Sequence, residues 1–418
     1  MVETSLSGAF GTAKKYFGRY LAVSAGATLS AAATVVAVDH FQKRHQSRKV
    51  KFPHLPPMDV QIGDTSTRVY TFGKDLFEQM LEAIHGAKSS IYLESYIWKS
   101  DETGRQFKDA VIDAAQRGVE VYLVYDMFAN FVVPREFFRF PAGIHVLAYP
   151  LFRPKVLTLD LSYTGRDHRK ILVVDEEIGF VGGYNIGQTY AEQWRDTHMR
   201  ITGPGVRELT SSFVTFWNHN RNGSLPHIEV QHTPDWLPRI QAAANAPIRQ
   251  VYPVRNIYLE AFKRATHHIY LTQAYFIPDA VFLQELLDAA ARGVDVRIIV
   301  PESSNHVLTD WLSRGQYSKM LRGGITIWLY KNAMVHAKTG TVDGEWTTIG
   351  TANIDRLSLQ GNYEINMSIY DRDLAATMEE VFEVDLSNCR KLELEEWENR
   401  PLTNKFGEYL LAPLSPLL

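Results

Sequence analysis

The sequence repeats itself in a fixed register. Six polar or glycine positions recur after 168 residues, five with the same residue and one with Glu in place of Asp. The pairs are His168 and His336, Lys170 and Lys338, Asp175 and Asp343, Gly182 and Gly350, Asn185 and Asn353, and Asp196 and Glu364. A repeat that serves packing alone preserves apolar periodicity and does not need these positions. The duplication therefore predicts two similar halves that each supply the same functional groups.

Shorter matches upstream indicate the secondary structure of both halves. Residues 91–96 and 269–275 are apolar, β-branched and aromatic runs typical of buried strands. Residues 113–121 and 288–296 each predict a helix that ends at Arg-Gly and a strand that follows, because the glycine supplies a left-handed C-cap. Strand, helix and strand in each half predict an α/β architecture with a largely buried sheet.

Composition shifts divide the chain into four segments. We expect an N-terminal hydrophobic helix with a basic linker over 1–56, a first α/β half over 57–222, a linker over 223–245, and a second α/β half with a C-terminal tail over 246–418. The second linker is polar and rich in proline, which favours an irregular connection. A single cysteine, Cys389, forbids an intrachain disulfide and suits a reducing compartment.

An uncharged stretch of nineteen residues, 20–38, lies between basic clusters near the N-terminus. A helix of this length spans the hydrocarbon core of a bilayer, although seven alanines make it weakly hydrophobic. Three interpretations stay open: a membrane anchor, a signal peptide, and a peripheral or buried helix. Five Lys or Arg follow the stretch and three precede it, which favours a catalytic body on the cytoplasmic side of the inner or cell membrane.

In both halves the repeated residues fall on a predicted hairpin. Alternation along the first strand puts His168 and Lys170 on one face, and the returning strand brings Asn185 back beside them. The second copy has the same form, with Asp343-Gly344 as a favourable hairpin dipeptide. An acidic residue follows 28 positions after each histidine. Each residue taken singly is compatible with a structural role, but the joint pattern favours a functional one.

This set of groups suits attack on a phosphodiester. One neutral imidazole can act as nucleophile, and the other, protonated, can donate to the departing alcohol. Two lysines and two asparagines supply donors for the phosphoryl oxygens, and Asp196 and Glu364 each hold an imidazole tautomer. Asp175 and Asp343 complete the candidate catalytic set, with turn formation as their alternative role. No cluster has convincing metal-ligand spacing, and we expect neither a metal nor another cofactor.

The two copies of His-x-Lys-x4-Asp-x6-Gly with a following Asn resemble the paired HKD motifs of the phospholipase D superfamily. Residues 194–198, 275–279 and 414–418 resemble the bacterial cardiolipin synthase branch of that superfamily, and the resemblance covers roughly residues 57–418. It implies two phospholipase D-like α/β halves, with mixed sheets flanked by helices. A pseudo-twofold axis would relate the halves, with one active site in the seam.

The same resemblance implies an activity and a partner. The activity is that of a membrane-associated phosphatidyltransferase, which moves a phosphatidyl group between two phosphatidylglycerol molecules through a phosphohistidine and releases glycerol. It implies His168 as nucleophile and His336 as general acid and base, although the symmetry of the sequence leaves either order open. The expected partner is an anionic phospholipid membrane, and no nucleic acid is expected.

The first half departs from the family pattern at Gly183 and in residues 126–130, which lack the Gly-Ser pair expected after Asp126, and it differs in length from the second half. Gly183 stands where the family often has a serine, whereas Thr351 keeps a hydroxyl in the second half. In the first half His168 follows Gly118 by 50 positions, whereas His336 follows Gly293 by 43 positions in the second half. This longer stretch contains Phe128, Phe131, Phe137, Phe138 and Phe140, interleaved with Arg135 and Arg139. We interpret several of the phenylalanines as core, with a loop that dips into the lipid interface as the alternative.

Net charge helps to weigh the remaining functions. Residues 1–51 hold eight Lys or Arg against two acidic residues, so they carry +6 and the rest carries −9 of the total −3. The alternative enzyme is a phosphodiesterase of the same superfamily that hydrolyses phospholipids or, less favoured, nucleic acid. A nuclease needs a basic groove, which an acidic body disfavours. The completeness of both motif sets disfavours a non-catalytic scaffold.

Overall fold

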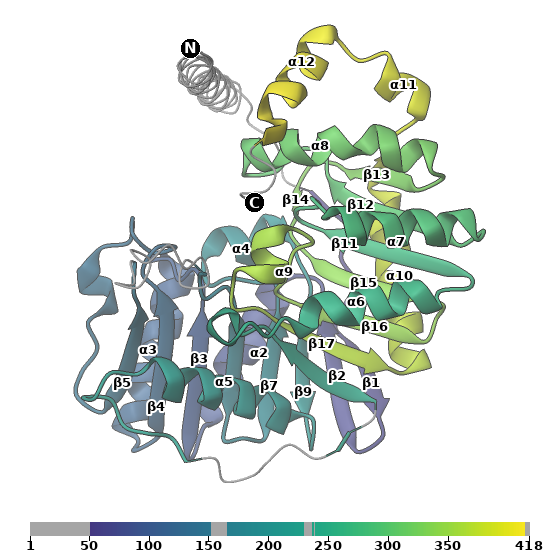
Figure 1. Cartoon of the computed structure of the whole chain (residues 1–418). Coiled ribbons are helices and arrows are strands. Elements are labelled where there is room, and N and C mark those ends of the chain that lie inside the picture. Colours follow the sequence, from purple (N-terminus) through teal and green to yellow (C-terminus); the bar gives the residue numbers. More distant parts are fainter. Residues whose placement is uncertain (1–50, 152–164, 230–235, 238, 414–418) are drawn as a thin grey trace, which may run out of the picture.

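The computed structural model describes residues 51–151, 165–229, 236–237 and 239–413. Over these residues the chain forms two eight-stranded mixed sheets, one in each half, flanked by helices (Figure 1). The predicted fold class, α/β with two similar halves, is confirmed. The expected N-terminal hydrophobic helix lies outside the described residues. Within the described ranges, no helix is both long and apolar enough to cross a membrane.

The first sheet has the order β1-β2-β9-β7-β6-β3-β4-β5. Its strands are β1 (Met58–Ile62), β2 (Thr65–Tyr70), β3 (Ser90–Ser95), β4 (Glu120–Asp126), β5 (Ile144–Tyr149), β6 (Lys170–Val174), β7 (Ile178–Gly182) and β9 (His198–Thr202). Its helices are α2 (Gly73–Gly86), α3 (Glu102–Gln116), α4 (Gln188–Glu192) and α5 (Val206–Asn220), with the 3-10 turn η1 (Arg135–Phe138).

The second sheet has the order β10-β17-β16-β15-β11-β12-β13-β18. Its strands are β10 (Ile240–Ala244), β11 (His268–Gln273), β12 (Asp295–Pro301), β13 (Thr326–Tyr330), β15 (Lys338–Val342), β16 (Trp346–Gly350), β17 (Ile365–Tyr370) and β18 (Cys389–Lys391). Its helical segments are η4 (Pro247–Arg249), α6 (Pro253–Arg264), α7 (Ala280–Ala291), α8 (Val307–Arg322), α9 (Arg356–Gln360), α10 (Arg372–Ser387), α11 (Leu394–Glu398) and α12 (Leu402–Leu411). Strand β10 falls within the segment expected as a linker and forms an edge of this sheet by pairing with β17.

Six strands of each sheet follow the same order. The run β9-β7-β6-β3-β4-β5 in the first sheet matches β17-β16-β15-β11-β12-β13 in the second. Strand β3 pairs parallel with β4 and antiparallel with β6, as β11 does with β12 and β15. The pairing register repeats as well. Leu93 pairs with Leu172 in the first sheet, and Leu271 pairs with Gly340, 168 residues after Leu172, in the second. The repeat in the sequence is therefore a repeat of the sheet.

The two predicted Arg-Gly helix ends have the expected geometry. Gly118 follows α3 with a φ of 93° and Gly293 follows α7 with a φ of 91°. These left-handed values favour glycine, since a side chain there is strained. Each helix therefore ends at the same point relative to the next strand, β4 or β12, and the two halves keep the same spacing.

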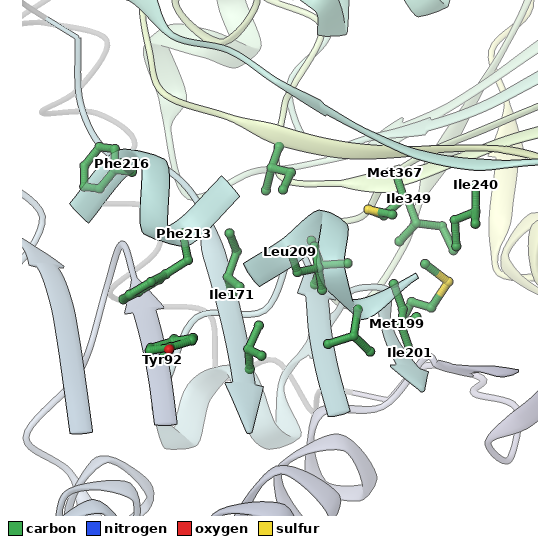
Figure 2. Packing of buried hydrophobic residues seen from close by; sticks show 14 of the residues in the cluster. Tyr92, Ile171, Met199, Ile201, Leu209, Phe213, Phe216, Ile240, Ile349 and Met367 are labelled. Carbon is green, nitrogen blue, oxygen red and sulfur yellow. The ribbon is translucent and has the colours of Figure 1, made fainter. Parts of the chain in front are cut away.

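The largest apolar cluster contains residues of both sheets. Figure 2 shows Leu209 and Phe213 of α5 between the strands of the first sheet and those of the second. Ile171 of β6 belongs to this cluster, and so do Ile349 of β16 and Met367 of β17. Burial of each such side chain contributes about 1.5–3 kcal/mol relative to exposure. The two halves thus share an apolar cluster at the seam, in addition to the clusters within each half.

The phenylalanine-rich stretch divides into two parts. Phe137 and Phe140 each lie 6.0 Å from the ring of Trp98, and Phe138 stacks on Tyr125 at 3.9 Å. The interpretation of several phenylalanines as core is therefore confirmed for these three, which pack against the core of the first half. Phe128 and Phe131 are exposed instead, in the turn between β4 and η1.

Candidate active site

Backbone hydrogen bonds across the seam position both histidines. His168, just before β6, donates its N–H to the carbonyl of Tyr363 at 3.0 Å. His336, just before β15, donates its N–H to the carbonyl of Arg195 at 2.6 Å. Tyr363 and Arg195 are 168 residues apart, and each immediately precedes the acidic residue of its own half. The seam therefore contains the same contact twice, once in each direction.

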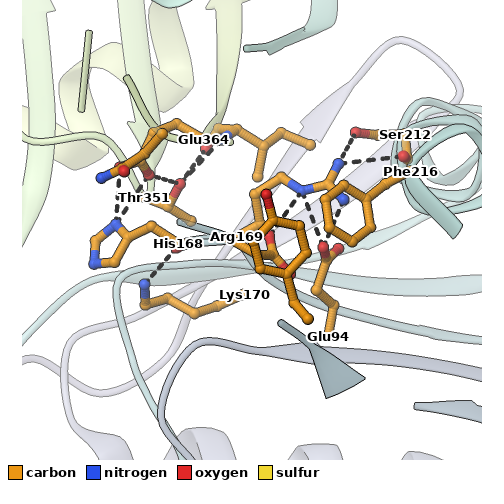
Figure 3. A network of polar contacts seen from close by, with 12 residues as sticks. Glu94, His168, Arg169, Lys170, Ser212, Phe216, Thr351 and Glu364 are labelled. Carbon is orange, nitrogen blue, oxygen red and sulfur yellow. Dashed lines mark hydrogen bonds and ion pairs between the residues drawn. The ribbon is translucent and has the colours of Figure 1, made fainter. Parts of the chain in front are cut away.

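Each imidazole is held by the carboxylate of the opposite half. His168 Nδ1 lies 2.9 and 3.0 Å from the two oxygens of Glu364, as Figure 3 shows. His336 Nδ1 lies 2.6 Å from Asp196 Oδ2. A carboxylate can only accept, so Nδ1 carries the proton and Nε2 is left as the reactive nitrogen in each ring. Glu364 and Asp196 are buried, which makes both contacts strong and directional.

The two lysines lie directly beside the histidines. Lys170 Nζ donates to the carbonyl of His168 at 2.5 Å, and Lys338 Nζ donates to the carbonyl of His336. Burial, together with the charge of Lys338, lowers the pKa of Lys170 to about 7. Burial lowers the pKa of Lys338 to about 8, against the opposing effect of Asp196 and Glu364. An anionic phosphodiester between these ammonium groups favours their charged forms, so the pair is suited to bind one.

The same electrostatic environment keeps the imidazoles neutral in the free protein. Burial lowers the pKa of His168, although Glu364 opposes this shift. Burial and the positive charges of Lys338 and Lys170 lower the pKa of His336 well below its usual value. A neutral imidazole has a free lone pair on Nε2, which a nucleophile requires. A bound phosphodiester anion raises the pKa of a neighbouring imidazole, which a general acid requires.

The two asparagines differ in their partners. Asn185 Oδ1 accepts the backbone N–H of Ile97 at 3.2 Å, which orients its amide. Asn353 Oδ1 is buried and has no hydrogen-bond partner among the described residues. A buried amide oxygen without a partner is costly in an apo protein. Both asparagines follow the returning strands β7 and β16, so the structure places them at the same ends of the hairpins as the histidines.

A steric reason explains why Gly183 stands where the family often has a serine. A Cβ at Gly183 would lie 2.1 Å from Oδ1 of Asp196, so no side chain fits there while Asp196 contacts His336. Thr351, at the matching position, donates its hydroxyl to Glu364 Oε2 at 2.5 Å. The two halves thus hold their carboxylates differently, with a glycine beside the shorter acid and a threonine beside the longer one.

Aromatic side chains and a third histidine, not predicted as site residues, border this cluster. The ring of Tyr96 lies 4.6 Å from that of His168, and the ring of Trp194 lies 4.9 Å from that of His336. Tyr96 ends a repeated run and Trp194 stands two residues before Asp196, and these positions in the sequence could have indicated them. His198 is buried, and burial lowers its pKa to about 3, so it stays neutral.

A polar network under His168 has no counterpart under His336. Arg169 donates to Glu94 through Nε at 3.0 Å and to the hydroxyl of Ser212 on α5 through a terminal nitrogen at 3.0 Å (Figure 3). The matching positions beside His336 are Val335 and Ala337, which belong to an apolar cluster. Beside His168 the chain is therefore held by ion pairs and hydrogen bonds of Arg169, whereas the matching residues beside His336 pack in an apolar cluster.

The structure does not bring Asp175 and Asp343 to this cluster, which corrects their inclusion in the candidate catalytic set. Each lies at the far end of its five-residue strand, about 17 Å along the sheet from the lysine. Asp175 accepts the backbone N–H groups of Lys88, Ser89 and Ser90 at 2.7–3.2 Å. Asp343 makes the same contacts with residues 266–268. Their repeated role is to join the hairpin turn to the connection between a helix and the next strand, α2 and β3 in the first half and α6 and β11 in the second.

Asp175→Ala and Asp343→Ala are each expected to lower the free energy of unfolding by about 2 kcal/mol, because backbone N–H groups lose a charged acceptor. Turnover per folded molecule should stay within twofold of the parent protein. These hydrogen bonds lower the pKa of both carboxyls, against burial that raises it. Their stabilisation is therefore present above the unfolded pKa, about 3.9, and is lost as the pH falls through the lower folded value.

Urea unfolding at pH 7 and at pH 3, with turnover measured on the same samples, checks this expectation. The difference in stability between parent and variant should shrink at pH 3. Loss of turnover without loss of stability would return these carboxylates to the catalytic set.

A family model described as "Cardiolipin synthase, PLD-like domain" matches residues 80–217 and 258–386. The chain belongs to this family. The matched residues include both histidines, both lysines and both carboxylates of the seam. The resemblance to the phospholipase D superfamily and its cardiolipin synthase branch is thereby confirmed.

Relatives of the cardiolipin synthase family match most of the chain. The major cardiolipin synthase ClsA of Bacillus subtilis (strain 168) is 35% identical over 368 residues, which cover 85% of this chain and 76% of the relative. A cardiolipin synthase of Clostridium perfringens is 32% identical over 84% of this chain and 76% of its own length. The crystal structure of phosphatidylserine synthase from Haemophilus influenzae Rd KW20 matches with a TM-score of 0.67 and 16% identity, covering 87% of this chain and 95% of that one. That similarity concerns the fold.

Proposed function

We propose that this protein is a membrane-associated phosphatidyltransferase that converts two phosphatidylglycerol molecules into cardiolipin and glycerol. The observation that carries the proposal is the pair of crossed histidine–carboxylate contacts, in a chain that belongs to the cardiolipin synthase family. The names of the relatives support the substrate and product. The catalytic set is His168, Lys170, Asn185, Asp196, His336, Lys338, Asn353 and Glu364.

In the first step, Nε2 of His168 attacks the phosphorus of one phosphatidylglycerol. His336 takes up a proton at Nε2 from solvent when the anionic substrate binds. A P–N bond forms while the bond from phosphorus to the glycerol oxygen breaks, and His336 gives that Nε2 proton to the departing oxygen. Lys170 and Lys338 stabilise the charge that spreads over the phosphoryl oxygens. Glu364 stabilises the positive charge that develops on His168.

In the second step, the terminal hydroxyl of a second phosphatidylglycerol attacks the phosphohistidine. His336, now neutral, takes the proton of that hydroxyl as its oxygen bonds to phosphorus and the P–N bond breaks. Cardiolipin leaves, His168 is again neutral, and His336 is again protonated at Nε2 for the next phosphatidylglycerol. The burial of both histidines supports transfer to an alcohol over hydrolysis, because little of either ring contacts bulk water.

The partner in this proposal is an anionic phospholipid membrane, which supplies both substrates. We propose that the enzyme lies at the inner or cell membrane with its body on the cytoplasmic side, because more basic residues follow residues 20–38 than precede them. Nucleic acid is not among the proposed substrates, because the chain beyond residue 51 carries −9 and offers no overall attraction for a polyanion.

Incubation of the full chain with phosphatidylglycerol vesicles tests the proposal. Cardiolipin and glycerol should appear in equal amounts, with phosphatidic acid as a minor product. His168→Ala and His336→Ala should each reduce cardiolipin formation by at least about 10³-fold, because each removes a group that bonds to or exchanges a proton with the reacting atoms. His85→Ala is the matched control, since His85 is exposed on α2. Phosphatidic acid as the main product would favour the hydrolase, and normal turnover of either seam variant would refute the two-histidine mechanism.

A further inference from the structure

A group of large apolar side chains is exposed in the turn after β4. Phe131 and Val132 are 77% and 70% exposed, and Phe128 and Met127 are 58% and 38% exposed. The residues that follow them are packed instead: Val133 is buried, and the rings of η1 pack around Trp98. The turn therefore presents apolar side chains outward while the chain on both sides of it is packed.

This turn is attached to the segments that hold His168. Asn130 is buried within the turn, and its side chain accepts the N–H of Trp98 and donates to the carbonyl of Tyr96, both at 2.8 Å. Asp126 accepts the N–H of Phe128 at 2.7 Å with one oxygen and that of Asp167 at 3.1 Å with the other. Tyr96 contacts the ring of His168, and Asp167 directly precedes it. Hydrogen bonds thus connect the exposed turn to the segments on both sides of His168.

The exposed charged groups beside the turn are mostly basic. Arg135 and Arg139 of the η1 segment are exposed, and neither forms an ion pair with another described residue, whereas Glu136 between them is acidic. Arg166, next to Asp167, lies 5.7 Å from the ring of Phe128. The matching turn of the second half, residues 302–306 after β12, has the polar sequence Glu-Ser-Ser-Asn-His. The apolar turn is therefore a feature of the first half alone.

We propose that residues 127–132 insert into the interface of an anionic phospholipid bilayer and hold the side of the seam that carries His168 against the membrane. This proposal rests on the proposed function, because it names the surface through which that site meets its lipid substrates. Four exposed apolar side chains suit insertion between head groups, and the adjacent arginines suit phosphate groups at the same depth. A stable protein–protein interface buries about 800 Å² on each partner, which is more than four side chains on one turn offer.

A spin label reports the depth of the turn directly. Cys389 is the only cysteine, so Phe131→Cys in a Cys389→Ser background accepts one nitroxide label. The control label goes on Glu177→Cys in the same background, in the exposed turn at the opposite end of β6. On addition of dioleoyl phosphatidylglycerol vesicles to the full chain, the label at 131 should lose accessibility to a water-soluble nickel chelate by roughly fivefold and gain accessibility to oxygen. The label at 177 should not change.

The outcomes separate this proposal from the proposed function. If the protein sediments with the vesicles while the label at 131 stays fully accessible to nickel, the turn does not face the bilayer and the proposal is refuted. If the label enters the bilayer but the protein makes no cardiolipin, the surface proposal stands and the proposed function fails. Phosphatidylcholine vesicles should give a weaker change, because the arginines then lack anionic partners.

A kinetic measurement gives an independent check. The double variant Phe131→Glu/Val132→Glu puts two charges at the tip of the turn, and charged groups are excluded from the bilayer interior. We expect the ratio of turnover on phosphatidylglycerol vesicles to turnover on a short-chain phosphatidylglycerol dissolved as monomer to fall about tenfold. The matched control is Glu177→Lys, also a change of charge but at the far end of the sheet. An unchanged ratio in the double variant would contradict the proposal.

Discussion

Glu364→Gln is expected to lower turnover about 10²–10⁴-fold by disabling His168, a residue of the opposite half. The Gln side chain keeps the size of Glu364 but has no charge, so it no longer stabilises the imidazolium that forms on His168 or fixes one tautomer at Nδ1. Asp196→Asn should have an effect of similar size through His336, which it contacts at 2.6 Å. Glu78→Gln on the exposed face of α2 is the control for the chemical change.

A substrate with an activated leaving group tests whether the pairing is crossed. A phosphatidyl ester of p-nitrophenol needs no general acid in its first step, because p-nitrophenolate leaves unprotonated. His336→Ala and Asp196→Asn should then release a burst of p-nitrophenolate and accumulate phosphohistidine. His168→Ala and Glu364→Gln should show neither.

The burst experiment has a clear contradictory outcome. If Asp196→Asn behaves like His168→Ala, each carboxylate acts on the histidine of its own half, and the crossed contacts have no catalytic meaning. If the burst pattern is reversed as a whole, His336 is the nucleophile and the crossed pairing still holds. The experiment therefore tests the pairing and the order of the two histidines separately.

Asp385→Ala is expected to lower the free energy of unfolding by about 3–5 kcal/mol, because it leaves the guanidinium of Arg195 buried without its partner. Both oxygens of Asp385, on α10 of the second half, accept from Arg195 at 2.8 Å, and both side chains are 1% exposed. Arg195 also donates to Thr197 at 3.0 Å beside Asp196. The ion pair thus joins α10 to the segment that orients His336.

Replacement of both partners should recover most of the stability. Arg195→Met/Asp385→Leu leaves no uncompensated charge, and apolar pairs of similar volume often match buried ion pairs in stability. Guanidinium chloride unfolding at pH 7 measures the effect. The exposed pair of Arg372 and Glu345, 81% and 59% exposed, is the control, and Arg372→Ala should cost less than about 1 kcal/mol. A double variant as unstable as Asp385→Ala would show that packing, not the unpaired charge, sets the cost.

The repeated residues predicted the site, but they included two aspartates that lie outside it. Histidine, lysine, asparagine and the late acidic residue recur because both halves use them at the seam. Asp175 and Asp343 recur for a different reason, since each accepts three backbone N–H groups at the far end of its hairpin. A repeated position shows that a residue is needed twice. It does not show whether the need is chemical or structural.

The phenylalanine-rich stretch shows a similar limit. Its composition predicts both packed and exposed aromatic rings, because phenylalanine serves cores and lipid interfaces alike. Phe138 packs on Tyr125, whereas Phe131, only seven positions earlier in the sequence, is exposed. The difference arises from the 3-10 turn η1, whose rings pack around Trp98, a residue more than thirty positions away in the sequence. Contacts at such separation are fixed by the folded sheet and not by local pattern.

The sequence by itself determined the duplication, the α/β class, the family and the chemical groups of the site, because these follow from residue type and spacing within each half. The tertiary structure alone decided which carboxylate serves which histidine. The spacing of 28 residues is the same in both halves and is compatible with either pairing. Only the packing of the two sheets around the apolar cluster that they share brings Glu364 to His168 and Asp196 to His336, since each His-bearing strand starts with a hydrogen bond to the other half.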